Sequence, residues 1–361
     1  MAASIKRFTI YLLAGANLAS ILITLFVGYA GHLNPTNWPW LTNAGLVYPA
    51  LLAINLAFLI LWLLFNPRWS LLSIAGFIVC YEPTRAYSPL NLPATPPDDA
   101  LKILSYNVCN YYDDGQQEGE SPTIRYIADT HADIVCLQEA VTGGSKQAQI
   151  DSLLYSQYPY HDTIGSNATG VIALLSCYPI KHKERIDYVS AGNISGAFTL
   201  DINGEDVVVV NNHLETTGLT LEDRQNFKVM VKGDMEGDSM RIESKRIIDK
   251  LGEASQLRAP QARAVASFLR KHAYQPLICV GDFNDSPLSY THHTIARELT
   301  DCFIATGNGP GISYHHSGFY VRIDHILCSS AWTPYHCYVD REIKSSDHYP
   351  IICWLKKQAK P

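Results

Sequence analysis

The chain has 361 residues and a formal net charge of −6, and its length suits one large domain or two modest ones. Residues 1–100 hold four basic and three acidic residues, so the chain's other 24 basic and 31 acidic residues give the remainder a formal charge of −7. Proteins that hold long nucleic acids usually carry a net basic face, so this balance argues against a tightly binding nuclease. The nine cysteines lack zinc-site spacing, and we expect most of them to lie buried in strands.

Three apolar stretches near the start of the chain predict a membrane anchor over residues 1–82. Residues 8–30 and 44–65 are each long enough to cross the ~30 Å hydrocarbon core of a bilayer as a helix, whereas residues 69–81 are short for a crossing. The alternatives are a signal peptide for the first stretch and buried core helices for the others. We expect a multi-pass integral membrane protein with three transmembrane helices, or with two if residues 69–81 do not cross.

Basic residues beside these stretches predict their orientation. Lys6 and Arg7 precede the first stretch and Arg68 follows the second, while the loop over 32–43 has no Lys or Arg. This pattern places the N-terminus and Arg68 in the cytoplasm. A third crossing then places the rest of the chain on the extracytoplasmic side, which is the periplasm in a bacterium. Without that crossing the rest of the chain is cytoplasmic.

Closely spaced prolines between Pro83 and Pro97 predict a linker over residues 83–99. Such a composition favours extended polyproline II backbone and a semi-rigid tether, which would hold the following domain a short distance from the bilayer. A disordered spacer is the alternative. The second domain is expected over residues 100–361.

Six short apolar runs in this second domain carry polar clusters at their ends. Runs this short, rich in β-branched residues and bounded by turn formers predict buried strands. Polar groups gathered at strand ends are costly to desolvate, so they predict a metal site or a catalytic site. Oxygen ligands without a cysteine cluster favour Mg²⁺, Mn²⁺ or Ca²⁺ over zinc. The runs are LKILSYNV, DIVCLQE, VVVVNNHL, PLICVGDFND, VRIDHILCS and SSDHYPIICWL, with candidate residues Asn107, Glu139, His213, Asp282, Asn284, Asp324, Asp347 and His348.

In this order the six clusters resemble the endonuclease/exonuclease/phosphatase superfamily, which includes pancreatic-type DNase, AP endonucleases, neutral sphingomyelinases and inositol-polyphosphate 5-phosphatases. The similarity extends from Leu101 to Leu355, and GDFN together with SDHxP is its most specific part. The segment from Arg258 to Gln261 also resembles the RxxQ helix of the family. The resemblance implies a DNase I-like α/β sandwich, in which two mixed sheets flanked by helices gather the clusters at one end.

The resemblance also implies a metal site. Asn107 and Glu139 would form the main site for Mg²⁺ or Mn²⁺, with Glu139 as the direct ligand. Asp347 would contribute to the same region. For Asn107 the alternative is a turn former that ends a strand.

Four other residues would act on the phosphate or on water. By resemblance, Asp282 orients or deprotonates the attacking water and Asn284 helps to hold the phosphate. His348, oriented by Asp324, would contact the scissile phosphate, since an imidazole held by a carboxylate suits developing negative charge. His213 would be a second phosphate-stabilising imidazole, although a histidine at a strand end is more often a surface residue.

Three further features lie outside the clusters. Strand alternation predicts that His325 faces away from the site, and the pair His292 and His293 is expected in a loop. Residues 221–257 form an insertion rich in charges of both signs, expected as an exposed helix near the rim of the site. This insertion is either a substrate-selecting lid or membrane-facing arm, or an ordinary solvated helix.

The expected activity is hydrolysis of a phosphodiester or a phosphomonoester by metal-assisted, in-line attack of water. A membrane anchor and an acidic domain favour a phospholipid head group or another small phosphodiester as substrate. The alternatives are a DNase-like nuclease and an inactive membrane protein that uses the fold to bind phosphate. Cys109 stands where AP endonucleases usually carry an aspartate, which argues against abasic-site repair. No protein partner is predicted, and the oligomeric state is left open.

Overall fold

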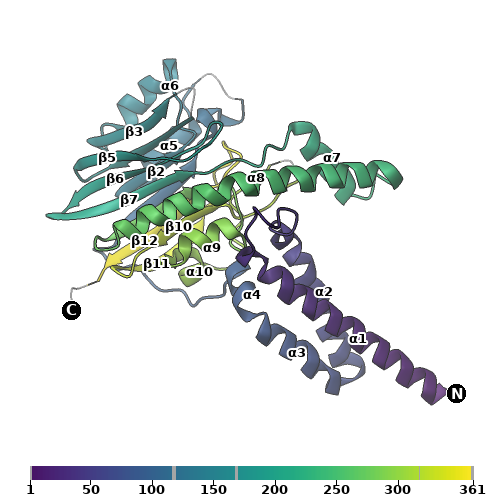
Figure 1. The fold of residues 1–361 in the computed structure, drawn as a ribbon. Helices are drawn as coiled ribbons and strands as arrows, with labels where there is room; N and C mark the ends of the chain where they lie inside the picture. The colour runs from purple at the N-terminus through teal and green to yellow at the C-terminus, as the bar shows by residue number, and fades with distance from the viewer. Residues whose placement is uncertain (1, 116–118, 167–169, 317, 359–361) are drawn as a thin grey trace.

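Two six-stranded mixed β-sheets packed face to face form the larger part of the molecule (Figure 1). The computed structural model describes residues 2–115, 119–166, 170–316 and 318–358. One sheet has the strand order β11-β12-β1-β2-β4-β3 and the other has the order β5-β6-β7-β8-β10-β9. Helices flank both sheets, so the predicted two-sheet α/β sandwich is confirmed.

Each of the six apolar runs contains a strand, as predicted. The first sheet comprises β11 (Trp332–Val339), β12 (Ile351–Lys357), β1 (Leu101–Asn107), β2 (Ile134–Gln138), β4 (Gly170–Ser176) and β3 (Tyr160–Ser166). The second comprises β5 (Ile180–Ile186), β6 (Ile194–Ile202), β7 (Glu205–His213), β8 (Leu277–Asp282), β10 (Asp324–Cys328) and β9 (Thr300–Asp301). The helices of this part are α5 (Pro122–Thr130), α6 (Gly144–Gln149), α7 (Leu221–Val231), α8 (Gly237–Lys271), α9 (Tyr290–Ala296) and α10 (Cys302–Thr306).

The central strands are buried on both faces. In β7, Val207 and Val209 lie in the core between the two sheets, whereas Val208 and Val210 pack in a second core that α8 covers. Successive side chains of a strand point to opposite faces, so a strand covered on both sides needs apolar residues at every position. This accounts for the unbroken run of valines. All nine cysteines are free thiols, and most are buried in these cores as expected.

Strand direction brings the six polar clusters to one end of the sandwich. β1 runs parallel to β2 and β7 runs parallel to β8, so the carboxyl ends of the strands in each pair lie together. β10 is antiparallel to β8 and β12 is antiparallel to β1, so these two strands begin where their partners end. The polar groups at the start of β10 and before β12 therefore meet those at the ends of the other four strands.

The N-terminal region is a bundle of three apolar helices that extends away from the sandwich, with the N-terminus at its far end (Figure 1). These are α1 (Ala2–Gly28), α2 (Tyr48–Phe65) and α3 (Ser70–Val79). Asn17 is fully buried, and its Oδ1 accepts hydrogen bonds from Trp62 Nε1 at 3.0 Å and from Ser73 Oγ at 2.8 Å. Large apolar side chains such as Leu22 and Phe26 are exposed instead. Polar contacts inside and apolar side chains outside are typical of transmembrane helix packing.

Two helical segments, Ser4–His32 and Ala44–Phe65, have the length and apolar composition needed to cross a membrane. The third, Pro67–Val79, is apolar but shorter. These helices coincide with the three apolar stretches identified in the sequence. The chain reverses direction between α1 and α2 and again between α2 and α3 (Figure 1).

The proline-rich segment differs from its prediction. α4 (Tyr81–Tyr87) continues the helical structure beyond α3, so the expectation of extended backbone is wrong for residues 83–87. Pro83 is tolerated there because the first turn of a helix needs no backbone N–H donor. From residue 88 to 100 the backbone has no regular structure, but it lies against the sandwich. Asn91 Nδ2, for example, donates to Ile304 O at 3.1 Å and to Gly307 O at 2.6 Å.

The loop between α1 and α2 also contacts the sandwich directly. Gly31 approaches the backbone of the turn before α9 so closely that a Cβ there would lie 2.4 Å from Leu288 O. Further along this loop, Asn43 Nδ2 donates to Ser255 Oγ of α8 at 3.0 Å. The helix bundle is therefore docked on the end of the sandwich that carries the polar clusters and is not held away from it by a tether.

The insertion over residues 221–257 forms α7 and the first half of α8. Thr220 caps α7 in a capping box with Asp223. The buried carboxylate of Asp223 also accepts from Arg246 Nε at 2.7 Å and pairs with Lys250, which ties the two helices together. The insertion is therefore a packed helical pair and not a single solvated helix.

The docking interface generates the first prediction. Gly31→Ala should lower the free energy of unfolding of the full-length protein in detergent by about 1–3 kcal/mol, because the added methyl group collides with the backbone at Leu288. Thermal unfolding followed by tryptophan fluorescence measures this change. Gly15→Ala is the matched control, since a Cβ at Gly15 meets nothing within 4 Å. Equal stability of the two variants would show that the close contact at Gly31 is absent in solution.

Candidate active site

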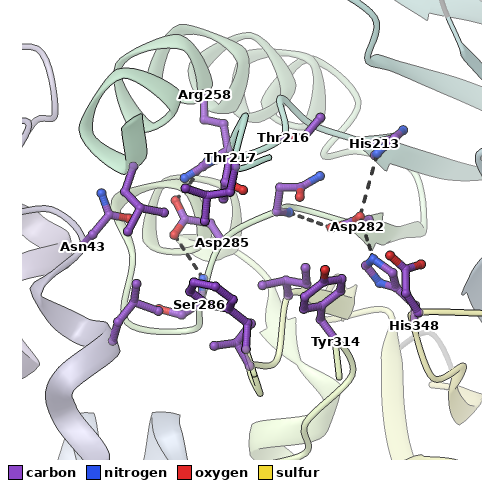
Figure 2. Close-up of a pocket in the computed structure, with 18 of the residues that line it drawn as sticks. Asn43, His213, Thr216, Thr217, Arg258, Asp282, Asp285, Ser286, Tyr314 and His348 are labelled. Atoms are coloured by element: carbon purple, nitrogen blue, oxygen red, sulfur yellow. Dashed lines mark hydrogen bonds and ion pairs between the residues drawn. The ribbon is translucent and has the colours of Figure 1, made fainter. Parts of the chain in front are cut away.

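The buried carboxylate of Asp282 lies at the centre of the polar cluster. One of its oxygens, Oδ2, accepts a hydrogen bond from Asn107 Nδ2 at 3.1 Å and lies 3.8 Å from His213 Nε2 and 3.6 Å from His348 Nε2. The other oxygen, Oδ1, accepts from the backbone N–H of Asn284 at 2.7 Å. Figure 2 shows the two imidazoles on either side of Asp282. The predicted residues of β1, β7 and β8 and of the segment before β12 are thus brought together around one carboxylate.

Asp324 holds the second imidazole in place. Its Oδ2 lies 2.8 Å from His348 Nδ1, and both side chains are buried. Burial disfavours the charged imidazole, but the carboxylates of Asp324 and Asp282 outweigh burial and raise the pKa of His348 well above its ordinary value. His348 is therefore a cation at neutral pH, with Nε2 turned toward Asp282.

The two imidazoles differ in charge. Burial lowers the pKa of His213, although Glu139 partly opposes this effect. Burial also raises the pKa of Asp282 to about 7, against the opposing influence of His348. A carboxylate with a pKa near neutrality, next to one cationic and one neutral imidazole, has the charge distribution of a general acid–base site.

Glu139 and Asp347 are the two carboxylates of the pocket that the sequence predicts as metal ligands. The side chain of Glu139 is 34% exposed, its backbone has a left-handed φ of 51°, and it lines the same pocket as Asp347. Asn107 Nδ2 donates to Glu139 Oε1 at 3.2 Å, which orients the carboxylate. Among the described residues neither carboxylate pairs with a Lys or Arg. Glu139 Oε1 also lies 3.5 Å from His213 Nε2. Carboxylate oxygens such as those of Glu139 and Asp347 are the hard ligands that Mg²⁺ and Mn²⁺ prefer.

The site opens into a pocket of about 830 Å³, part of which is open to solvent. Sequence reasoning missed several of its residues, namely Asn43 and Leu46 from the loop before α2, Thr216, Thr217 and Leu219 after β7, and Arg224 and Leu251 from the insertion. No polar cluster at a strand end marks these positions. Only the charge pattern of the insertion, which predicted a helix near the rim, pointed to part of this set.

The RxxQ segment of α8 bonds to the two loops that follow His213 and Asp282. Arg258 is buried on α8, where its Nη1 donates to Glu215 O at 3.0 Å and its Nε donates to Asp285 Oδ2 at 3.3 Å. Gln261 Oε1 accepts from the backbone N–H of Glu215 at 2.9 Å. These contacts fix the loops that follow His213 and Asp282. Asn284 has a similar function, because its Nδ2 donates to Leu214 O at 2.9 Å while the residue lines the pocket.

A second group of buried histidines lies on the opposite face of β10. His325 faces away from the site, as predicted, and its Nε2 donates to Asp285 O at 3.0 Å. His292 Nε2 lies 2.7 Å from Asp301 Oδ2, and Asp301 also caps α10. The expectation of a loop position for His292 and His293 is wrong, because both lie in α9 and His292 is buried. Two adjacent histidines in a sequence do not indicate that a carboxylate elsewhere in the chain, here Asp301, will bond to one of them in the interior.

The sequence matches the model of the Endonuclease/Exonuclease/phosphatase family over residues 104–348. The chain therefore belongs to this family, and it is a metal-dependent hydrolase of phosphoester bonds. A second family model, a domain of unknown function (DUF8431), matches residues 10–87, the span of the helix bundle and α4. No curated protein sequence matches the chain.

Solved structures share the fold at low sequence identity. An endonuclease/exonuclease/phosphatase from Beutenbergia cavernae is 17% identical with a TM-score of 0.51, over 72% of this chain and 72% of that chain. A humanized D. rerio TDP2 is 17% identical with a TM-score of 0.50, over 72% and 99% of the two chains. The human nocturnin catalytic domain with bound sulfate is 14% identical with a TM-score of 0.50, over 73% and 97%. These likenesses confirm the expected DNase I-like fold.

The contact between Asp324 and His348 generates the second prediction. Asp324→Asn removes the nearest negative charge while burial remains, so the pKa of His348 should fall. The imidazolium is lost as the pH rises through this pKa, so the alkaline limb of the pH–rate profile should move to lower pH. The turnover number at neutral pH should fall by about 10²–10⁴-fold.

This prediction is measured as the pH dependence of kcat for the full-length enzyme on an activated phosphodiester. The matched control is Asp340→Asn, because Asp340 accepts a hydrogen bond from Tyr126 at 2.7 Å but does not line the pocket. A wild-type pH profile in Asp324→Asn would contradict the role of Asp324 in holding His348 protonated.

Proposed function

We propose that the protein is a membrane-anchored phosphodiesterase that hydrolyses a phospholipid head group or a similar small phosphodiester. The observation that carries this proposal is the position of the catalytic cluster. Asp282 and its two imidazoles lie in a pocket whose rim includes Asn43, from the loop between the two longest apolar helical segments, and Leu46, from the start of the second segment. An enzyme built in this way meets its substrate at the surface of a bilayer.

In the proposed reaction Asp282 accepts the proton of the attacking water, for which a pKa of about 7 suits it. His348 and His213 stabilise the charge that develops on the phosphate, and Asp324 keeps His348 cationic. Asn284 helps to hold the phosphate.

Glu139 and Asp347, with Asn107 orienting Glu139, would hold Mg²⁺ or Mn²⁺. The cation, when bound, polarises the phosphate and stabilises the leaving oxygen. The donor set of two carboxylates and an amide favours Mg²⁺ or Mn²⁺ over metals that prefer thiolate or imidazole ligands.

We further propose that the three N-terminal helices cross the membrane and that the catalytic domain lies on the extracytoplasmic side. Lys6 and Arg7 lie close to the N-terminus, which Figure 1 shows at the end of the bundle remote from the sandwich, and Arg68 lies in the connection between α2 and α3. The positive-inside rule assigns such basic residues to the cytoplasm. In this arrangement α3 together with α4 provides the third crossing, and residues 88–100 connect the bundle with the catalytic domain.

The main alternative is a nuclease. The structure of D. rerio TDP2 in complex with a single-strand DNA product shows that this fold accommodates nucleic acid in that protein. The acidic balance of the present catalytic region weighs against a tightly binding nuclease. An inactive phosphate-binding membrane protein is disfavoured because all six polar clusters are intact. Four of them line one pocket, and Asn107 and Asp324 bond to Asp282 and His348 of that pocket.

The substrate class is tested with the full-length protein in detergent micelles containing Mg²⁺ or Mn²⁺. We expect hydrolysis of phospholipid vesicles and of bis-p-nitrophenyl phosphate, loss of both activities with EDTA, and recovery on addition of Mn²⁺. Asp282→Asn and His348→Gln should each lower kcat by about 10²–10⁴-fold on both substrates.

Plasmid DNA and rising ionic strength distinguish the nuclease. Nuclease binding weakens steeply with salt because counterions are released, whereas hydrolysis of a lipid head group should change little. Plasmid nicking that both variants abolish, with no turnover of lipid, would overturn the lipid assignment and establish the nuclease.

The orientation is tested in spheroplasts of a bacterial host that produces the protein with an N-terminal epitope tag. Protease added from outside should digest the catalytic domain and leave the tag intact until the membrane is permeabilised. A resident cytoplasmic protein is the control for leakage. Protection of the catalytic domain in sealed spheroplasts would contradict a third crossing.

A further inference from the structure

The active-site pocket has an apolar wall that the catalytic clusters do not supply. Leu219 and Leu251 belong to a small buried cluster, and Leu46 and Phe319 pack against it. All four side chains also line the pocket that contains Asp282 and His348. The pocket is therefore polar at the catalytic cluster and apolar on the side formed by the insertion and the N-terminal loop.

Three segments far apart in the sequence build this wall. Leu46 precedes α2 and comes from the helix bundle, Leu251 comes from α8 of the insertion, and Phe319 comes from the loop before β10. The N-terminal loop is fixed on α8 at two points, by the hydrogen bond from Asn43 to Ser255 and by the close approach of Pro39 O to Gly252. The segments that form the wall are therefore held together by packing and by a hydrogen bond.

The pocket also extends beyond the catalytic cluster, because its lining runs from Asp282 and His348 to Leu46 and Leu251. Arg224 of α7 lines it as well, with its guanidinium 5.5 Å from the centre of the Tyr314 ring and bonded to the Tyr314 hydroxyl. A cation of this kind suits a further anionic oxygen of a ligand whose phosphate is held near Asp282.

We propose that the apolar wall binds the hydrophobic chain of a lipid phosphoester, with the scissile phosphate beside Asp282, and that Leu46 makes the membrane anchor part of the substrate site. This inference rests on the proposed phosphodiesterase function. Continuity with the bundle favours a lipid chain as the occupant, because the loop that carries Leu46 leads directly into α2, whose outer surface is lined by exposed apolar side chains.

Two soluble phosphodiesters test the proposal with the full-length protein and Mn²⁺. Methyl p-nitrophenyl phosphate and butyl p-nitrophenyl phosphate both release p-nitrophenolate when the oxygen of water bonds to phosphorus, and the alkyl group stays on the phosphate. They differ only in the length of that chain. The wild-type enzyme should prefer the butyl ester in kcat/KM by about tenfold, as expected for burying additional methylene groups.

Leu46→Ser should reduce this preference toward equality, mainly through KM for the butyl ester. Phe319→Ser, at a half-buried position on another segment, should act in the same direction. The ratio of the two substrates normalises for any loss of folded protein. Leu92→Ser is the matched control, because Leu92 is 93% exposed in the segment that follows α4 and should keep the wild-type ratio.

The outcomes separate this inference from the proposed function. Hydrolysis of both esters with a wild-type ratio near one would overturn the apolar subsite and leave the phosphodiesterase standing. A high ratio that survives both Leu46→Ser and Phe319→Ser would place the chain elsewhere and also overturn it. Absence of hydrolysis of either ester by metal-loaded protein would reject the proposed function itself, and the inference with it.

Discussion

The catalytic end of the molecule depends on the stabilisation of one buried carboxylate. Asp282 is 1% exposed, and an ionised carboxylate removed from water is strongly destabilising unless hydrogen bonds and opposite charge compensate for its lost hydration. Asn107, the backbone N–H of Asn284 and the cationic His348 supply that compensation from three different segments. The compensation is incomplete, because burial still raises the pKa of Asp282 to about 7. A carboxylate poised in this way can exchange a proton near neutrality.

The sheet topology makes this convergence possible. Two parallel strand pairs, one in each sheet, bring Asn107, Glu139, His213 and Asp282 to the same end of the sandwich. The antiparallel neighbours β10 and β12 begin at this end, so Asp324 at the start of β10 and His348 just before β12 lie there too. Because each strand is rigid and buried on both faces, the polar groups at its end have little freedom. The α8 residues Arg258 and Gln261 then fix the loops between these groups.

The helix bundle packs on the sandwich and also lines the pocket of the candidate site. In contrast to a water-soluble bundle, it buries the polar Asn17 and exposes large apolar side chains. The segment between α1 and α2 docks on α8, and Leu46 of this segment lines the pocket. The insertion meets that loop and provides Leu251 to the same cluster. The bundle, the insertion and the sandwich thus line one pocket together, while the polar clusters of that pocket belong to the sandwich.

The sequence by itself determined six of the twelve strands that the structure describes and the polar residues at their ends, because local apolar runs bounded by polar groups indicate buried strands. Asn107, Glu139, Asp282 and His348 were identifiable in this way, as were the three apolar helices. Tertiary structure alone decided which distant segments meet. Leu46, Leu251 and Phe319 are ordinary apolar residues in the sequence, and their common wall exists only because the bundle docks on α8. His292 is buried in α9 because Asp301 lies beside it, and residues 83–87 are helical because a proline in a first helical turn breaks no hydrogen bond. Contacts between residues far apart in the chain leave no local pattern, so only the folded molecule reveals them.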